Sequence, residues 1–328
     1  MTAPYPTIAD IGAAARRIAS RALRTPLLES PLLNETLGGR LLVKPECLQV
    51  TGSFKFRGAF NKISQMDEER RTRGVIAFSS GNHAQGVAAA AHMSGAPAVI
   101  VMPEDAPAIK IENTRAWGAE IVTYPRHDAD REVIAAEIAE ERGLYLVKPY
   151  DDNDIIAGQG TTGLEIAQQC DEMGIVPDAV TVCCGGGGLS AGCAIVLKAE
   201  FPICDVHTVE PEGWDDTARS LEGGERVRIV DSPPSLCDAL LAPTPGEQTF
   251  AINKTHVTSG LVVSENDVID AMAAANRFFK LVAEPGGAVA LASVLSGKLE
   301  VRQRTVVAVI SGGNVDVALY AELLARAS

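Results

Sequence analysis

The first residue that could do chemistry is a lysine at an unusual place in a predicted helix. Residues 51–58 read TGSFKFRG, and the apolar Phe56 and Phe60 recur at helical spacing. Ser53 is a favoured N-cap residue, so the pattern predicts a helix that begins at Ser53 and carries Lys55 in its first turn. The positive field of a helix N-terminus and burial beside phenylalanines both lower the pKa of a lysine. Lys55 is therefore predicted to act as an amine nucleophile, which must lose its proton to react.

A run of four glycines follows a predicted strand and could hold a phosphate. The apolar stretch DAVTVCC leads into Gly185, Gly186, Gly187 and Gly188, and LSAG then opens a helical stretch. Successive glycines let backbone N–H groups converge on one anion, and the helix N-terminus adds its field. The loop lacks the Gly-Lys-Ser/Thr ending of a P-loop, which disfavours hydrolysis of nucleoside triphosphates. The sequence therefore predicts a phosphate cradle here.

Two further strand ends carry small and polar residues. VIAF leads into SSGNHAQG (residues 79–86), a loop at a helix start that could hold a carboxylate. Asn82 and His83 in this loop could equally be turn-forming and capping residues. The third strand, VVAVI, leads into SGGN and is followed directly by Ser311. Because ligands bind at the carboxyl ends of strands in open α/β sheets, the three loops are predicted to face one crevice.

The elements that must position these residues alternate along the chain. Short β-branched runs are followed by alanine-rich helical stretches, and the runs lie at residues 74–78, 96–102, 119–124, 178–184, 204–210 and 304–311. This alternation is typical of parallel sheets covered by helices. The first thirty residues are predicted to form an amphipathic helix, and residues 213–261 a loop-rich surface. The KPYDD stretch at residues 148–152 is a plausible crossing point between two domains.

Composition sets the broad class of the protein. The 328 residues, 46% of them hydrophobic, suffice for one large or two medium α/β domains. The net charge of −13 argues against nucleic acid or an anionic membrane as a partner. No stretch approaches the roughly 20 apolar residues of a membrane span. The seven cysteines form no Cys-x-x-Cys pair and are interpreted as reduced core thiols of a cytoplasmic protein, and the five histidines lack the spacing of a zinc hydrolase.

Taken together, the motifs resemble the fold-type II pyridoxal 5′-phosphate (PLP) enzymes, specifically the serine/threonine dehydratase and serine racemase family. The motifs that carry the resemblance follow one another in family order: TGSFKFRGA, SSGNHAQG, AGQGT at residues 157–161, CGGGGLSAG, EPGGAVALA from Glu284 and SGGN from Ser311. The resemblance implies an α/β fold of two open parallel-sheet domains, similar to tryptophan synthase β, with the cofactor in the crevice between them. It implies a large PLP-binding domain at residues 1–73 and 152–328, and a small substrate-binding domain at residues 74–151.

The resemblance also implies roles for the residues above. Lys55 would bind PLP as a Schiff base and remove the α-proton of the substrate, while the four glycines hold the phosphate. Asn82 would contact the 3-hydroxyl of the cofactor and Ser311 would face its pyridine nitrogen, with Phe54 and Glu284 completing the cofactor site. A hydroxyl at the ring nitrogen gives a weaker electron sink than a carboxylate, which favours expulsion of a β-substituent. The implied reaction is β-elimination of water from serine, threonine or 3-hydroxyaspartate, which yields a 2-oxo acid and ammonia.

Three positions bear on the substrate and on a second activity. Ser80 falls where serine racemases carry the serine that works on the cofactor face opposite the lysine, so the resemblance also allows racemisation. Tyr150 falls where threonine dehydratases have an aromatic residue, which favours dehydration instead. Arg131 matches an arginine near the substrate in racemase-like members and could pair with a second carboxylate, although a solvated helix arginine fits the sequence equally well. The other predicted substrate-binding residues are Ser79, Gly81, Asn82 and His83.

The stretch VEPEGWDD resembles the divalent-cation site of racemase-like members. Glu210, Asp216 and the main-chain carbonyl of Trp214 would be the ligands, and oxygen ligands of this kind suit Mg²⁺ or Ca²⁺ in a structural role. The resemblance further implies a homodimer with a small amino acid as substrate.

One alternative comes from a different class of protein. The pattern Gly186-x-Gly188-x-x-Ala191 fits the dinucleotide fingerprint, and Glu210 follows about 20 residues later, as a NAD(P)-binding Rossmann oxidoreductase requires. This alternative leaves TGSFKFRG and SGGN without a function.

Overall fold

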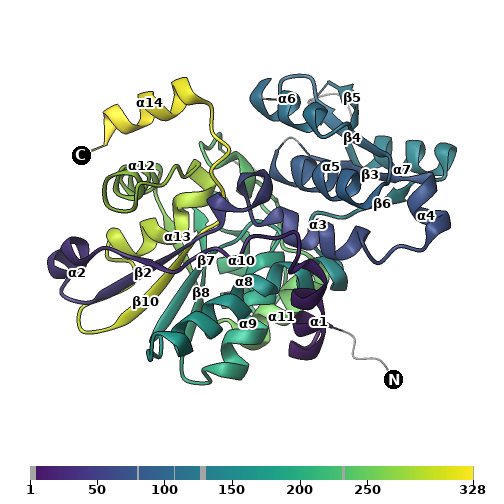
Figure 1. Cartoon of the computed structure of the whole chain (residues 1–328). Helices are drawn as coiled ribbons and strands as arrows, with labels where there is room; N and C mark the ends of the chain where they lie inside the picture. Colours follow the sequence, from purple (N-terminus) through teal and green to yellow (C-terminus); the bar gives the residue numbers. More distant parts are fainter. Residues whose placement is uncertain (1–4, 80, 107, 126–130, 231–232, 328) are drawn as a thin grey trace.

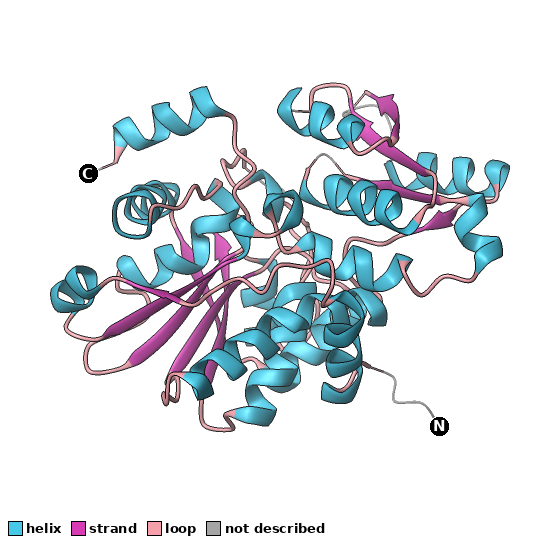
Figure 2. Ribbon diagram, in the orientation of Figure 1, coloured by secondary structure: helices cyan, strands magenta, loops and turns pink. Residues whose placement is uncertain are grey.

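The computed structural model describes residues 5–79, 81–106, 108–125, 131–230 and 233–327. Two sheets, each flanked by helices, make up the molecule (Figures 1 and 2). The larger sheet has the strand order β1-β2-β10-β7-β8-β9 and the smaller one the order β5-β4-β3-β6. All neighbouring strands pair in parallel except β1, which pairs antiparallel with β2. The predicted fold class, two parallel-sheet α/β units, is confirmed.

The strands are β1 (Leu28–Glu29), β2 (Arg40–Pro45), β3 (Val75–Phe78), β4 (Ala98–Pro103), β5 (Glu120–Tyr124), β6 (Tyr145–Leu146), β7 (Ala179–Cys183), β8 (Asp205–Pro211), β9 (Ser259–Val263) and β10 (Thr305–Ile310). The α-helices are α1 (Ile8–Ile18), α2 (Pro31–Leu37), α3 (Lys55–Ile63), α4 (Glu68–Arg73), α5 (Asn82–Ser94), α6 (Ala108–Ala116), α7 (Arg131–Arg142), α8 (Asn153–Glu172), α9 (Gly188–Glu200), α10 (Asp216–Gly223), α11 (Glu247–His256), α12 (Glu265–Ala274), α13 (Pro285–Leu295) and α14 (Val317–Arg326). Short 3-10 turns are η1 (Glu46–Leu48), η2 (Val50–Gly52) and η3 (Asp238–Leu240), and η4 (Ala275–Phe279) is a π-helical turn.

The six predicted strand runs are all strands, and the helical stretches that follow them are helices. The prediction of a loop-rich surface at residues 213–261 holds for the described residues between α10 and α11, apart from η3, but the segment also contains these two helices. Its prolines lie in the connection between the two helices, whereas α11 buries Phe250 and Ile252. The apolar burial that stabilises α11 is therefore obscured in the sequence by the prolines that precede the helix.

The strands of the smaller sheet all lie between Val75 and Leu146, and those of the larger sheet lie outside that range. The chain leaves the larger sheet through α3 and α4 and returns to it through residues 147–152 and α8. Domain boundaries at residues 73/74 and 151/152 stay a prediction.

Helix α3 joins the two sheets, because it packs against both α5 and α8. Phe56, Ala59 and Phe60 are buried in a cluster shared with the alanines of α5 and with the smaller sheet. Alanine-rich helices can approach closely, so α5 is held against the first turns of α3. The start of α3 is thus enclosed by elements from both halves of the molecule.

Helix α3 begins one residue later than predicted. Ser53 is extended (φ −162, ψ 158), forms a β-bridge with Gly312 and does not cap the helix, whose N-cap residue is Phe54. The bridge fixes the backbone of Ser53 to the loop that follows β10, which overrides its capping preference. Lys55 is the first helical residue, so its predicted place in the first turn is confirmed.

No helix within the described ranges is long and apolar enough to cross a membrane. All seven cysteines are free thiols, and six of them are buried.

Candidate active site

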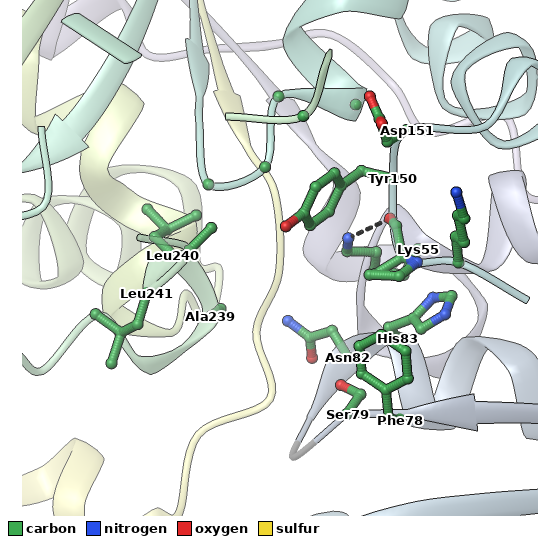
Figure 3. Close-up of a pocket in the computed structure, with 18 of the residues that line it drawn as sticks. Lys55, Phe78, Ser79, Asn82, His83, Tyr150, Asp151, Ala239, Leu240 and Leu241 are labelled. Carbon is green, nitrogen blue, oxygen red and sulfur yellow. Dashed lines mark hydrogen bonds between the residues drawn. The ribbon is translucent and has the colours of Figure 1, made fainter. Parts of the chain in front are cut away.

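A cavity of about 810 Å³ lies where the strand ends of the two sheets meet (Figure 3). Its wall includes Lys55 at the start of α3 and Asn82 at the start of α5. It also includes the Gly185–Gly188 loop after β7 and Ser311 after β10. The prediction that three strand-end loops face one crevice is confirmed.

The Lys55 amine is half-buried at the wall of this cavity. Its Nζ donates a hydrogen bond to the Pro149 carbonyl oxygen at 2.9 Å, drawn as the dashed line in Figure 3, and lies 5.1 Å from the centre of the Phe54 ring. Burial lowers the pKa of Lys55 from 10.5 to about 8. An amine with this pKa is neutral in a substantial fraction of molecules near neutral pH, as a nucleophile or a base requires.

The glycine loop keeps its surface free of side chains. Gly187 has a φ of +90°, a conformation that favours glycine, and directly precedes α9. A Cβ on Gly186 would lie 2.2 Å from the ring of Tyr150, so a side chain cannot fit at this position. Backbone N–H groups at the start of α9 are therefore accessible from the cavity and suit an anion.

Asn82 is held by two partners behind the wall. Its Nδ2 donates to Oε1 of Glu284, and its Oδ1 accepts from Nδ2 of Asn314 at 2.8 Å. Glu284 is buried, and burial together with the charge of Asp238 raises its pKa to about 7, although Lys110 opposes the shift. The predicted cofactor residue Glu284 does not line the cavity and acts on it through Asn82.

Two neighbours of Asn82 shape the same loop. His83 donates from Nε2 to the Val147 carbonyl at 2.9 Å, and burial and the Lys55 charge lower its pKa to about 3. His83 is therefore neutral and ties α5 to the residue that follows β6. The Ser79 hydroxyl accepts from the Gly81 N–H at 3.1 Å. Ser80 lies outside the described residues.

Most of the predicted site residues line the cavity: Phe54, Lys55, Ser79, Gly81, Asn82, His83, Arg131, Tyr150, Gly185, Gly186, Gly187, Gly188 and Ser311. Arg131 begins α7, and its guanidinium carbon lies 5.7 Å from the centre of the Phe78 ring. The roles assigned to these residues stay predictions.

Several wall residues escaped the sequence analysis. Lys110 on α6 donates to Asp238 on η3 at 2.7 Å and so bridges the two halves of the molecule beside the cavity. Ala239, Leu240 and Leu241 lie across the open space from Lys55 and Asn82, as Figure 3 shows. The only available signal for this wall was the apolar stretch ALLA within a segment rich in proline.

The predicted metal ligands lie at the end of β8 and the start of α10. The two oxygens of Glu210 accept from the backbone N–H groups of Thr217 and Ala218 at 2.9 and 2.7 Å. Both oxygens of Asp216 are buried and have no hydrogen-bond partner. Within the described part of the chain, no group of three or more His, Cys, Asp or Glu side chains could hold a metal ion. Burial and the charge of Asp216 raise the pKa of Glu210, so the two carboxylates are neighbours, and a third ligand would have to be a main-chain or water oxygen.

Glu210 also bears on the dinucleotide alternative. A dinucleotide-binding enzyme uses an acidic residue at this position to bind ribose hydroxyls. The Glu210 carboxylate is instead fully buried and bonded to the N-terminus of α10, so the structure does not support that alternative.

Comparison with known proteins identifies the family. A family model described as "Pyridoxal-phosphate dependent enzyme" matches residues 18–312. L-threo-3-hydroxyaspartate ammonia-lyase from Saccharomyces cerevisiae is 41% identical over 319 residues, which are 97% of this chain and 96% of that relative. Serine racemase from Schizosaccharomyces pombe is 39% identical over 321 residues, 98% of each chain. The crystal structure of a threonine deaminase from T.th. is 45% identical, with a TM-score of 0.90 over 95% of this chain and 99% of that chain. The chain therefore belongs to the family of pyridoxal-phosphate dependent enzymes, as its motifs predict.

Proposed function

We propose that this protein is a PLP-dependent ammonia-lyase that removes water from small 3-hydroxy amino acids and releases a 2-oxo acid and ammonia. The observation that carries the proposal is the half-buried Lys55 amine, with its pKa lowered to about 8, in the same cavity as the Gly185–Gly188 loop. Similarity to ammonia-lyases over nearly the whole chain supports the reaction type.

The described residues fit the cofactor. The backbone N–H groups of the glycine loop would hold its phosphate, because the loop offers no side chain and ends in a helix N-terminus. Asn82 would contact the 3-hydroxyl, oriented by Glu284, and Ser311 would face the ring nitrogen. Phe54, whose ring lies 5.1 Å from Lys55 Nζ, would help to keep water from the amine. When bound, PLP supplies the electron sink that makes the α-proton of an amino acid removable.

The protein side chains then bind the substrate and move its protons. The neutral Lys55 amine would take the α-proton, since its lowered pKa frees the lone pair near neutral pH. The loop of Ser79, Gly81, Asn82 and His83 would bind the α-carboxylate at the start of α5. Tyr150 and the apolar Leu240 and Leu241 would enclose the substrate from the other sides.

Arg131 is proposed to set the preference for a substrate with a second carboxylate. Arg131 lines the cavity at the start of α7, and a guanidinium pairs with a carboxylate through two hydrogen bonds. L-threo-3-hydroxyaspartate, the substrate after which two similar enzymes are named, carries this second carboxylate. We therefore place 3-hydroxyaspartate first among the candidate substrates, with serine and threonine next.

Serine racemisation is proposed as a second activity of the same site. It is supported by the similarity to serine racemase and by Ser80, whose predicted role is on the cofactor face opposite Lys55. Chiral chromatography of serine after incubation with the enzyme tests it, because elimination alone consumes serine and never interconverts its enantiomers.

A structural Mg²⁺ or Ca²⁺ ion is proposed at Glu210, Asp216 and the main-chain carbonyl of Trp214. The two buried Asp216 oxygens without partners fit a hard cation, which prefers carboxylate oxygen. We expect the melting temperature of chelator-treated protein to rise when Ca²⁺ is added, and this rise to be lost in Asp216→Asn.

A homodimer in the cytoplasm completes the proposal, and the seven free thiols are consistent with a reducing compartment.

The first experiment is to record the visible absorbance of the purified protein and to assay 2-oxo acid with each of the three substrates. Lys55→Ala is expected to abolish both the cofactor absorbance and turnover. Lys148→Ala, which removes another lysine from the cavity wall, is the matched control and should retain the absorbance. Full turnover in Lys55→Ala, or a colourless protein that PLP does not reconstitute, would refute the proposal.

A further inference from the structure

The short segment Pro149–Asp151, which returns the chain from the smaller sheet to α8, contacts three parts of the candidate active site. The Pro149 carbonyl accepts the hydrogen bond from Lys55 Nζ at 2.9 Å. The ring of Tyr150 packs directly on Gly186. Asp151 follows Tyr150 and lines the cavity as well (Figure 3).

Asp151 caps a helix that is far away in the sequence. Its Oδ1 accepts from the N–H groups of Gln248 at 2.7 Å and Thr249 at 3.3 Å, in the first turn of α11. The N-cap residue of α11 is Gly246, which has no side chain to cap the helix. A Cβ on Gly246 would lie 2.4 Å from Asp151 Oδ1, so the glycine makes room for this carboxylate. Asp151 itself has a φ of +55°, which is uncommon for a residue other than glycine.

The capped end of α11 in turn holds the glycine loop. Thr249 donates from Oγ1 to the Gly186 carbonyl at 2.7 Å, and the Gly246 N–H donates to the same oxygen at 3.3 Å. One turn later, Nδ2 of Asn253 donates to the Ser190 hydroxyl at 3.0 Å, in the first turn of α9. Thr249 and Asn253 are fully buried, so these bonds are not exchanged with bulk water. The direction of the Gly186 peptide therefore depends on the first turn of α11.

We infer that Asp151 is a positioning residue for the phosphate loop: by capping α11 from the segment that joins the two sheets, it fixes the Gly186 peptide and the N–H groups that follow it. The inference rests on the proposed role of Gly185–Gly188 in holding the cofactor phosphate. Loss of the cap frees the first turn of α11, and the loop then loses the orientation that favours an anion. Binding of a ligand without the phosphate does not depend on this contact.

The test compares the binding of PLP with that of pyridoxal, which lacks the phosphate, by titrating the cofactor-free protein and following the visible absorbance. Asp151→Ala removes the cap, and Asp151→Gly removes the cap while relieving the left-handed backbone. Both are expected to weaken PLP binding by several-fold to about tenfold, the range that corresponds to the free energy of losing an N-cap, and to leave pyridoxal binding unchanged. Asp151→Asn keeps an acceptor and tolerates the positive φ, so it should restore PLP binding.

Asp67→Ala is the matched control, because Asp67 caps α4 through the Arg70 N–H at 2.8 Å and does not line the cavity. It should leave both dissociation constants unchanged. Should Asp151→Ala fail to fold, Thr249→Val removes the next bond in the same series and should cause the same phosphate-specific loss.

Equal weakening of PLP and pyridoxal binding in Asp151→Ala would overturn the inference, because the defect would then not pass through the phosphate loop. Recovery of PLP binding in Asp151→Gly would also overturn it, since backbone strain and not the cap would be the cause. A native protein that binds pyridoxal as tightly as PLP would instead refute the proposed phosphate cradle itself.

Discussion

Arg57 and Glu46 form a fully buried ion pair through two hydrogen bonds, Nε to Oε2 at 2.7 Å and Nη2 to Oε1 at 2.8 Å. The same guanidinium donates to both oxygens of Glu165 on α8 at 2.7 and 2.8 Å. Lys44 on β2 binds Glu165 from the other side at 2.7 Å. Because Arg57 is two residues after Lys55, this network fixes the start of α3 to the larger sheet and to α8.

Replacing Arg57 with Met is expected to lower the free energy of unfolding by about 3–5 kcal/mol, because Glu46 would be left buried without its partner. Urea denaturation measures this change. Arg24→Ala is the control, since Arg24 pairs with Glu172 at the surface, where an ion pair contributes about 0–1 kcal/mol. Losses of equal size in the two variants would contradict a special role for burial.

The lowered pKa of Lys55 predicts how the cofactor-free protein captures PLP as pH changes. Only the neutral amine attacks the aldehyde, so the rate should rise with pH and reach half its maximum near pH 8 instead of near 10.5. Stopped-flow absorbance measures the rate, and Nα-acetyl-lysine assayed in parallel corrects for the titration of PLP itself. A midpoint above pH 10 would show that burial does not lower this pKa.

The raised pKa of Glu284 predicts that the stability of the folded protein depends on pH. Its pKa rises from 4.5 to about 7 on folding, so between these values the native state keeps a proton that the unfolded chain has lost. The stability contributed by Glu284 is therefore fully present below pH 4.5 and is lost as the pH rises through 7. Its size is on the order of 1 kcal/mol per unit of pKa difference.

Glu284→Gln keeps an acceptor for Asn82 and cannot titrate. Relative to the native protein, the variant should therefore gain in free energy of unfolding between pH 5 and pH 8, as measured with urea at both values. Glu172→Gln, at an exposed position, is the control. Its free energy of unfolding should differ from that of the native protein by the same amount at pH 5 and at pH 8. If the free energy of unfolding of Glu284→Gln also differed from the native value by the same amount at both pH values, the raised pKa of Glu284 would be contradicted.

Arg131→Ala should discriminate between substrates. The loss of one charge-assisted hydrogen-bonding partner typically weakens binding by about 10–100-fold. The kcat/KM for 3-hydroxyaspartate should therefore fall by this factor, while the kcat/KM for serine should stay unchanged. Lys148→Ala removes a positive charge from the same wall and should not discriminate. An equal loss on both substrates would reject the second-carboxylate role.

The residues at strand ends could be found from the sequence because each follows a short apolar run. Lys55 stands out by the helix spacing around it, and Gly185–Gly188 and Ser311 follow β7 and β10 directly. Their meeting in one cavity follows from the parallel arrangement of the strands. Local pattern and one topological rule were therefore sufficient for this part of the site.

The remaining contacts are invisible in the sequence because they join distant segments. Asp151 meets Gln248 and Thr249, and Lys110 meets Asp238, across separations that no periodicity encodes. β2 is not among the predicted strands for a different reason: RLLVKP carries a lysine, and Lys44 is buried because Glu165, Gln169 and the Thr25 carbonyl oxygen all bind it. Ser53 shows that a capping preference gives way when a backbone bridge to Gly312 competes with it.

The place of β2 in the larger sheet also determines the order in which a nascent chain can complete its pairings. β2 lies between β1 and β10, and its ladder with β10 joins Arg40–Pro45 to Thr305–Ile310. During synthesis, β2 has no partner on that side until the ribosome has translated β10. The strands of the smaller sheet, from Val75 to Leu146, meet over far shorter loops, whose closure costs less entropy. An unpaired β2 edge is thus exposed for most of translation, when strand-to-strand aggregation is the competing outcome.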